Sequence, residues 1–294
     1  MKGRAKLVLA VVHTVLNTRN DPAQQITVIE PQARWGLLDW RELWQYSDLL
    51  YFMVWRSVKV AYAQSIGGLA WVIIQPALQV IVFSLVFGGL LSVGTEGVPY
   101  PLLTTLAVVP WTYLSATMNG ASVSLVTNSQ MLAKVYFPRI IFLLTPVLSN
   151  LIPFSVSLIL VAAAMLYYQV QPTAQLVYLP LVFVLMIITP LAIGLWLSSL
   201  AIRFRDVRIV MGYFMRLLIY LVPVMYPSSQ IPDEYRVYYI LNPFVGVIEG
   251  YRSCFLGDPM RWDSLGVSAV VSVVLLLSGA LYFKRMERII VDVI

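Results

Sequence analysis

The sequence predicts an all-α protein that crosses a membrane several times. Of its 294 residues 60% are hydrophobic and only 12% are charged, whereas about 25% of residues are charged in soluble domains. Six apolar stretches approach the roughly 20 residues that a membrane-spanning helix needs. Lysine and arginine collect in alternate connections between these stretches. Together these observations predict a polytopic helical membrane protein.

The chain begins with a polar stretch and an amphipathic one. We expect residues 1–40 to form a cytoplasmic tail and residues 41–66 to form a helix in the membrane interface. Its middle, Leu49–Trp55, is apolar, but Asp48 and Arg56 bracket it too closely for a span. Polar side chains gather near one side of the helical wheel and apolar ones near another, which is typical of a helix lying on a membrane. The alternative is a surface helix of a soluble domain, and the apolar spans that follow argue against it.

A six-span transmembrane domain is predicted for residues 67–294. Gly67 and Gly68 provide a hinge after the interface helix. The second span is rich in hydroxyl and small residues, which in membrane helices are usually packing contacts. The expected spans are residues 71–91, 101–126, 140–168, 176–201, 209–226 and 265–283.

The distribution of basic residues predicts the orientation. Sixteen of the twenty lysines and arginines fall in the tail with the interface helix (residues 1–70), the 127–139 loop, the connection after the fourth span and the C-terminal end. Three fall on the opposite side, and Arg216 lies inside the fifth span. Because basic loops stay in the cytoplasm, both termini and the interface helix are expected on that side.

The connection from 227 to 264 is too long for a plain loop. Asn242 and Pro243 have the residue types of a helix start, and about thirteen mostly apolar residues follow. Glu249 and Arg252 in this run are three residues apart, within pairing reach on a helix. We expect two short re-entrant helices in the outer leaflet. A small folded extracytoplasmic cap is the alternative.

The sequence argues against several kinds of chemistry. No pair of carboxylates lies within a span, which argues against proton-coupled transport. There is no P-loop motif for ATP. The single cysteine and the single histidine, Cys254 and His13, leave no metal-binding cluster. We therefore expect a protein that is not an enzyme and binds no cofactor itself.

Aromatic side chains in the spans are candidates for the lining of a transport path. Sugar rings stack on aromatic faces, so such a lining would suit a glycan. Tyrosine and tryptophan near span ends are, however, usually interface anchors, and we prefer that interpretation for Trp111 and Tyr113. Arg216 has no acid in its own helix, so a functional role is the default hypothesis, with snorkelling to the headgroups as the alternative. The candidate lining set is Phe83, Phe87, Tyr213, Phe214, Arg216 and Tyr220.

Several motifs, in their order and spacing, resemble the membrane subunit of ABC-2 type (type V) polysaccharide exporters. The resemblance covers about residues 26–284. It is carried by the segments LLYFMVWRSVKVAYAQSIGGLAWVIIQP, NSQMLAKVYFPR, RFRDVR, PVMYPSSQIP and LNPFVGVIEGYR. The branch that exports O-antigen and lipopolysaccharide looks most similar, and teichoic-acid exporters share much of the pattern.

The resemblance implies where and how the protein works. The expected location is a bacterial inner membrane. It implies a homodimer with two copies of a separate P-loop ATPase that binds ATP and Mg, and a lipid-linked glycan that passes at the subunit interface along spans one and five. Residues 128–137 would form the coupling helix beside a clamp at 41–62. Expected ATPase-coupling residues are Asn128, Gln130, Met131, Leu132, Lys134, Tyr136, Phe137, Arg41, Trp44 and Asp48. The implied outer gate is a pair of short helices, residues 232–240 and 243–256, in the gate region 227–264. The residues expected to act in or beside this gate are Tyr226, Asn242, Pro243, Glu249 and Arg252.

Three alternatives remain open on the sequence. The first is an exporter with the same fold that moves teichoic acid, capsule, small lipids or drugs. A membrane enzyme that modifies glycans is of another class, and Glu249 would be its only candidate acid. A scaffold without transport is the third.

Overall fold

The computed structural model describes residues 40–63, 65–95, 97–132, 137–204 and 206–293. The fold below is that of the unit 37–294. The predicted N-terminal tail lies outside the described residues.

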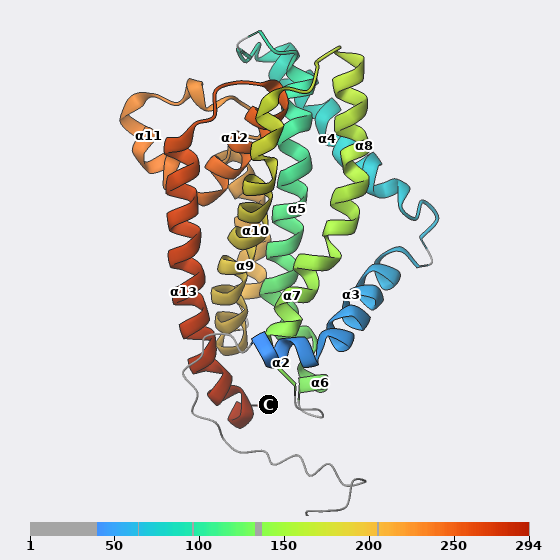
Figure 1. The fold of residues 1–294 in the computed structure, drawn as a ribbon, viewed down its shortest axis with the longest axis vertical. Coiled ribbons are helices and arrows are strands. Elements are labelled where there is room, and N and C mark those ends of the chain that lie inside the picture. Colours follow the sequence, from blue (N-terminus) through green and yellow to red (C-terminus); the bar gives the residue numbers. More distant parts are fainter. Residues whose placement is uncertain (1–39, 64, 96, 133–136, 205, 294) are drawn as a thin grey trace, which may run out of the picture. The chain divides into compact units, whose positions relative to one another are not determined.

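A long helix, α5 (Tyr100–Thr127), forms the centre of this unit. It packs against α4, α7, α8, α9, α10 and α12, and Figure 1 shows it between these neighbours. Leu106, Leu114 and Met118 are completely buried along it. The only side chains of α5 in the exposed class are those of Thr112, Asn119 and Thr127. The most central helix therefore presents polar groups where it is not covered.

Four helical segments in the described residues are long and apolar enough to cross a membrane. The first, Ala70–Leu90, consists of α4 (Ala70–Phe83) and the π-helix η2 (Ser84–Leu90), and the second, Ile140–Tyr167, consists of α7 (Ile140–Ser149) and α8 (Leu151–Tyr167). The third, Ala174–Arg203, consists of the 3-10 helix η3 (Ala174–Tyr178) and α9 (Leu179–Arg203). The fourth, Trp262–Met286, is the first part of α13 (Trp262–Val293). The hydroxyl-rich α5 is not among them, and α10 (Val207–Leu218) with η4 (Ile219–Leu221) is shorter. Six crossings remain a prediction.

Prolines explain two departures from the predicted spans. The helix α10–η4 ends at Leu221, five residues before the predicted limit, because Pro223 forces Val222 into an extended conformation. The third predicted span is divided at Asn150. Pro153 has no N–H to donate to the carbonyl of Ser149, so one helical hydrogen bond is missing at this point.

The predicted interface helix consists of two pieces, α2 (Trp40–Gln45) and α3 (Ser47–Tyr62). Met53 on α3 is buried in a cluster that includes Phe137, Ile141 and Phe142, and Figure 1 shows α3 beside α7. The large side chains of Tyr51, Phe52 and Trp55 are exposed on α3. After Tyr62 the chain turns at Gly67 and Gly68, which has φ +47°, and α4 begins at Ala70.

The long connection before α13 folds into η5 (Ser228–Gln230), α11 (Asp233–Ile240) and α12 (Pro243–Leu256). Most of α12 is buried against α5, α9 and α13. It ends at Gly257, whose φ of +80° is a left-handed helix cap that favours glycine. A Cβ there would also lie 2.6 Å from Thr173. We call residues 227–264 the outer region.

Candidate functional site

The helix α10 buries a single stripe of side chains. Met211, Met215 and Leu218 are buried, and they recur at the spacing of one helix face. On the rest of the helix, large side chains are exposed: Tyr213 by 64% and Phe214 by 45%. A helix within a membrane protein that exposes aromatic and charged groups faces something other than its own chain.

Arg216 lies on this exposed side. Its guanidinium carbon is 5.8 Å from the centre of the Tyr213 ring, close enough for a cation–π contact. No ion pair joins it to an acid among the described residues. Tyr220 is also exposed on the η4 continuation, and its carbonyl accepts a hydrogen bond from Tyr226 Oη at 2.8 Å. Four predicted lining residues therefore belong to one exposed surface, the α10 face, made of Tyr213, Phe214, Arg216 and Tyr220.

The other two predicted lining residues form a separate pair. Phe83 and Phe87 meet edge to face at 6.0 Å, where α4 passes into η2. Both are half-buried, and Phe83 packs against the main core. No ring contact joins this pair to α10 in the described part of the chain. Within one chain the predicted lining set is thus split in two.

The non-helical segment 222–227 after α10 is held by side chains from two helices. Arg252 of α12 donates hydrogen bonds to the carbonyls of Val224 at 3.3 Å and Tyr226 at 3.4 Å. Tyr100 Oη of α5 donates to the Met225 carbonyl at 2.6 Å. Burial lowers the pKa of the Arg252 guanidinium to about 10, which leaves it protonated at neutral pH. A buried cation thus fixes this irregular segment of backbone against the core.

Asn242 and Pro243 start α12 as their residue types predict. The Oδ1 of Asn242 accepts from the Phe244 N–H at 3.1 Å, which caps the helix, and Pro243 occupies its first turn. The Asn242 Nδ2 also donates to the carbonyl of Leu221 at 3.2 Å. The start of α12 is therefore tied to the end of η4.

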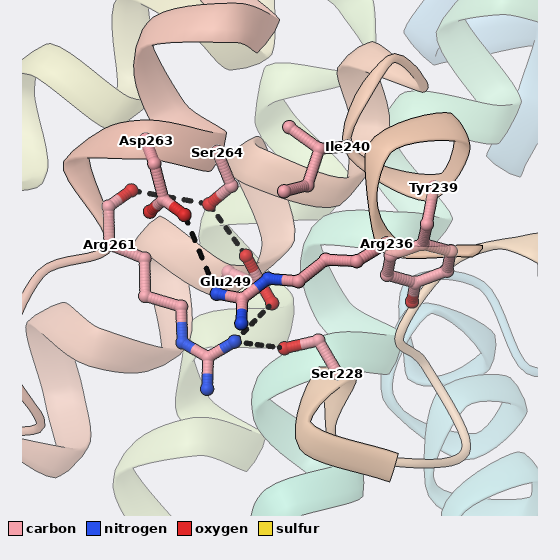
Figure 2. A pocket seen from close by; sticks show the side chains of 8 residues that line it. All are labelled: Ser228, Arg236, Tyr239, Ile240, Glu249, Arg261, Asp263 and Ser264. Carbon is pink, nitrogen blue, oxygen red and sulfur yellow. Dashed lines mark hydrogen bonds and ion pairs between the residues drawn. The ribbon is translucent and has the colours of Figure 1, made fainter. Parts of the chain in front are cut away.

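Glu249 has different partners from the one that its spacing suggests. Its Oε2 accepts from Ser264 Oγ at 2.6 Å, and its Oε1 lies 3.6 Å from Arg261 Nη1. The predicted ion pair with Arg252 is not among those formed by the described residues, because Arg252 points to the carbonyls of segment 222–227. Arg261 Nη1 also donates to Ser228 Oγ at 3.0 Å. As Figure 2 shows, these side chains converge from α12, α13 and η5.

The cavity beside Glu249 is small and closed by ion pairs. Arg236 of α11 lies 3.5 Å from Asp263 of α13 across it. Its volume is about 10 Å³, room for about one water molecule. Burial raises the pKa of the Tyr239 phenol, which also lines the cavity, well above its usual value. This cluster can fasten α11 and η5 to α13, but it has no room for a sugar.

The predicted coupling residues divide into anchors and exposed groups. Asn128 follows α5 and donates from Nδ2 to the Ser124 carbonyl at 2.8 Å. The short helix α6 (Ser129–Leu132) occupies the first half of the predicted coupling helix. Met131 and Leu132 pack against the cluster that buries Phe137 to 4% exposure. These three side chains join the loop to α3 and α7.

The exposed members of the coupling set are Gln130, Asp48 and Trp44, the last 82% exposed. They lie on the accessible sides of α6, α3 and α2. Lys134, Tyr136 and the side chain of Arg41 lie outside the described residues.

Comparison with known protein families decides the class of the molecule. The model for the ABC-2 type transporter matches residues 48–256, from the first turn of α3 to the last residue of α12. The chain belongs to the ABC-2 type transporter family. This match covers the interface helix, the central helices and most of the outer region of the ABC-2 chain.

Relatives of this ABC-2 chain are named as exporters of polysaccharides. It is 29% identical to the O-antigen export system permease protein RfbA of Myxococcus xanthus, over 83% of this chain and 94% of the relative. It is 22% identical to RfbA of Klebsiella pneumoniae, over 82% and 92%. It is 24% identical to the polysialic acid transport protein KpsM of Escherichia coli, over 80% and 92%.

Arg261, Ser264 and Tyr100 were missed by sequence reasoning about the ABC-2 site. The first two could have been found, because Gly257 ends α12 and the chain then reverses into α13. Residues at similar distances on either side of such a turn face each other. Tyr100 gave no signal, since it is 125 residues from the carbonyl that it binds.

Proposed function

We propose that this chain is the permease subunit of an ATP-driven exporter that moves a lipid-linked polysaccharide, such as O-antigen, out of the cytoplasm. The names of the relatives support a polysaccharide cargo over small lipids or drugs. The observation that carries the proposal is the α10 face, where three aromatic rings and Arg216 are exposed on a helix of the membrane domain. Aromatic faces suit sugar rings, and an exposed arginine suits a polar path.

The proposed assembly is a homodimer with two copies of a separate P-loop ATPase, which carries ATP and Mg. The glycan passes between the two permease copies, along α10 and the first span. Exposed apolar side chains along α4, among them Ile74, Leu78 and Ile81, support a second subunit or lipid on that side. In this proposal the chain crosses the inner membrane six times, α5 and α10 included, with both termini in the cytoplasm.

The cytoplasmic coupling surface consists of α3 and the loop 127–139 in this proposal. ATP-driven closure of the partner subunits pushes on Gln130 and on the exposed side of α3. Met53 and Phe137 share one buried cluster with Ile141 of α7 and Phe283 of α13. Because packed clusters move as units, the push reaches two membrane helices together. The two proposed gate helices of the outer region, residues 232–240 and 243–256, open in response.

A pair of substitutions on α10 tests the path. Arg216→Leu and Tyr213→Ala should each lower surface polysaccharide at least about tenfold, which corresponds to roughly 1.4 kcal/mol in the transport barrier. The permease should still assemble with its ATPase, because neither side chain is buried. The measurement is surface glycan per permease copy in cells that depend on this chain. Leu281→Ala on α13, which is also exposed, at 54%, is the control. Normal export in both α10 variants would remove them from the path.

Glu249→Gln separates the exporter from the glycan-modifying enzyme. Glutamine still accepts from Ser264 but loses the attraction to Arg261, an ion pair whose arginine is 37% exposed. Glu249 is only 7% exposed, so glutamine also removes the desolvation cost of a buried charge, which offsets the lost attraction. We therefore expect export to stay within about threefold of the parent. An enzyme with this acid as its catalyst would lose all turnover. If Glu249→Gln leaves the fold intact but abolishes export completely, the exporter hypothesis is rejected in favour of an enzyme that uses this acid.

A further inference from the structure

A second and larger cavity lies apart from the α10 face and from the outer region. Its volume is about 350 Å³, within the range of about 300–1,000 Å³ typical of small-molecule sites. Its described lining residues come from the end of α3, the hinge, the first turns of α4, the middle of α5 and the α7–α8 junction, and none belongs to α10. We call it the lateral cavity.

Three polar side chains line the lateral cavity with unused hydrogen-bonding capacity. Gln75 lies on the apolar helix α4, and its amide forms no hydrogen bond with the described residues. Asn150 donates from Nδ2 to the Pro146 carbonyl at 2.8 Å, which leaves its Oδ1 free to accept. Thr112 donates to the Val108 carbonyl at 2.7 Å and keeps its own lone pairs. Gln75 and Thr112 are exposed and Asn150 is half-buried, so these groups are accessible to a ligand that enters the cavity.

The backbone around these groups is also unusual. The third predicted span breaks at Asn150, beside the cavity, and broken membrane helices are tolerated where they line a cavity or are covered by protein. At the rim, Trp71 is 45% exposed. A Cβ on Gly67 would lie 2.5 Å from its Nε1, so the glycine at the hinge lets the indole take this position.

The charge of the lining selects the ligand. No lysine, arginine, aspartate or glutamate is among the described lining residues, so a diphosphate or a carboxylate would find no counter-ion there. An acyl chain would leave the amide of Gln75 and the Oδ1 of Asn150 without partners. A neutral ring bearing hydroxyl groups would satisfy both and could stack on the exposed indole of Trp71.

We propose that the lateral cavity binds one neutral sugar unit of the lipid-linked glycan. The site extends the proposed function and depends on it for the source of the sugar. The cavity begins at the hinge, beside the predicted cytoplasmic interface, where the sugars nearest the lipid anchor would arrive. Thus the sugar is recognised at α4 and α5 before it reaches the α10 face.

A photo-crosslinking experiment tests this site without any need for export. The full-length permease, purified without sugar detergents and placed in phosphatidylcholine nanodiscs, is exposed to a dodecyl glucoside with a diazirine on its first chain carbon. A probe with the same chain and a phosphocholine head is used in parallel. Mass spectrometry should place the glucoside on peptides containing residues 61–76, 109–116 and 150–157, and the phosphocholine probe should label them at least about tenfold less, which corresponds to roughly 1.4 kcal/mol.

Substitutions make the test specific to the polar groups. Gln75→Leu should lower glucoside labelling several-fold, and Asn150→Leu should do the same if its thermal unfolding midpoint stays near that of the parent. Gln79→Leu, one turn further along α4 and outside the lining, should change nothing. Thr112→Val, an exposed position on α5, gives a second variant with little risk to folding.

The outcomes are decisive in each direction. Equal labelling by both probes would make the cavity an acyl-chain site and overturn the proposal, as would no labelling of these peptides. Glucoside labelling that is unaffected by Gln75→Leu and Thr112→Val also overturns it. If the glucoside labels the cavity but the chain supports no polysaccharide export, the sugar site stands and the exporter proposal fails.

Discussion

Replacing Arg252 by methionine should release segment 222–227 from the core and abolish export. Methionine fills similar space but donates no hydrogen bond, so the carbonyls of Val224 and Tyr226 lose their partners. An unsatisfied buried acceptor costs about 1–3 kcal/mol; the bond to Val224 is buried and the bond to Tyr226 is half-buried. The thermal unfolding midpoint of the purified permease should fall by several degrees. Hydrogen exchange should rise selectively in residues 219–227.

Arg236→Met is the matched control in the same outer region. The side chain of Arg236 is 46% exposed, and its partners Asp233 and Asp263 are 97% and 56% exposed. Ion pairs of this kind contribute at most about 1 kcal/mol, so stability and export should change little. If the two variants behave alike, Arg252 does not hold the segment.

The second large effect is expected at Gly246, where α12 crosses α13. An added Cβ would overlap the backbone oxygen of Ser264 and the hydroxyl of Ser268. The same hydroxyl accepts a hydrogen bond from the Gly246 N–H at 3.1 Å. Because the overlap is with backbone, the helices must separate, and overpacking of this kind costs about 1–3 kcal/mol or more. Gly246→Ala should lower the unfolding midpoint and the yield of folded protein.

Gly266→Ala on α13 is the control for helix propensity. No atom lies within 4 Å of a Cβ at this position, and alanine is intrinsically a better helix former than glycine by about 1 kcal/mol. Stability should be unchanged or slightly higher. Equal losses in both variants would mean that close approach of α12 and α13 is not the reason for Gly246.

The positions of the helices followed from local properties of the sequence. Apolar run length placed the helices at 70–90, 140–167 and 174–203 to within a few residues. Asn242 and Pro243 correctly gave the start of α12. The π-helix at Ser84–Leu90 could not be foreseen, because its hydrogen bonds skip one residue more than those of an α-helix and leave no periodic mark in an all-apolar run.

The contacts between helices were harder to predict. Spacing along one helix suggested Glu249 and Arg252 as partners, but each side chain found another element. The exposed side of α10 could be anticipated from Arg216 and the tyrosines near it. Its separation from Phe83 and Phe87 could not, since periodicity gives the face of a helix and not its neighbour. In the same way, nothing local showed that Phe137 would be buried against Met53.

The position of α5 has a consequence for how the chain is made. Its neighbours α7, α8 and α9, which cover it, follow it in the sequence. Its hydroxyl-rich composition keeps it out of the set of strongly apolar helices, and polar residues weaken the partition of a single helix from the translocon into lipid. We therefore expect α5 to remain beside the translocon during synthesis until later helices arrive. The innermost helix would then be among the last to reach its final position in the membrane.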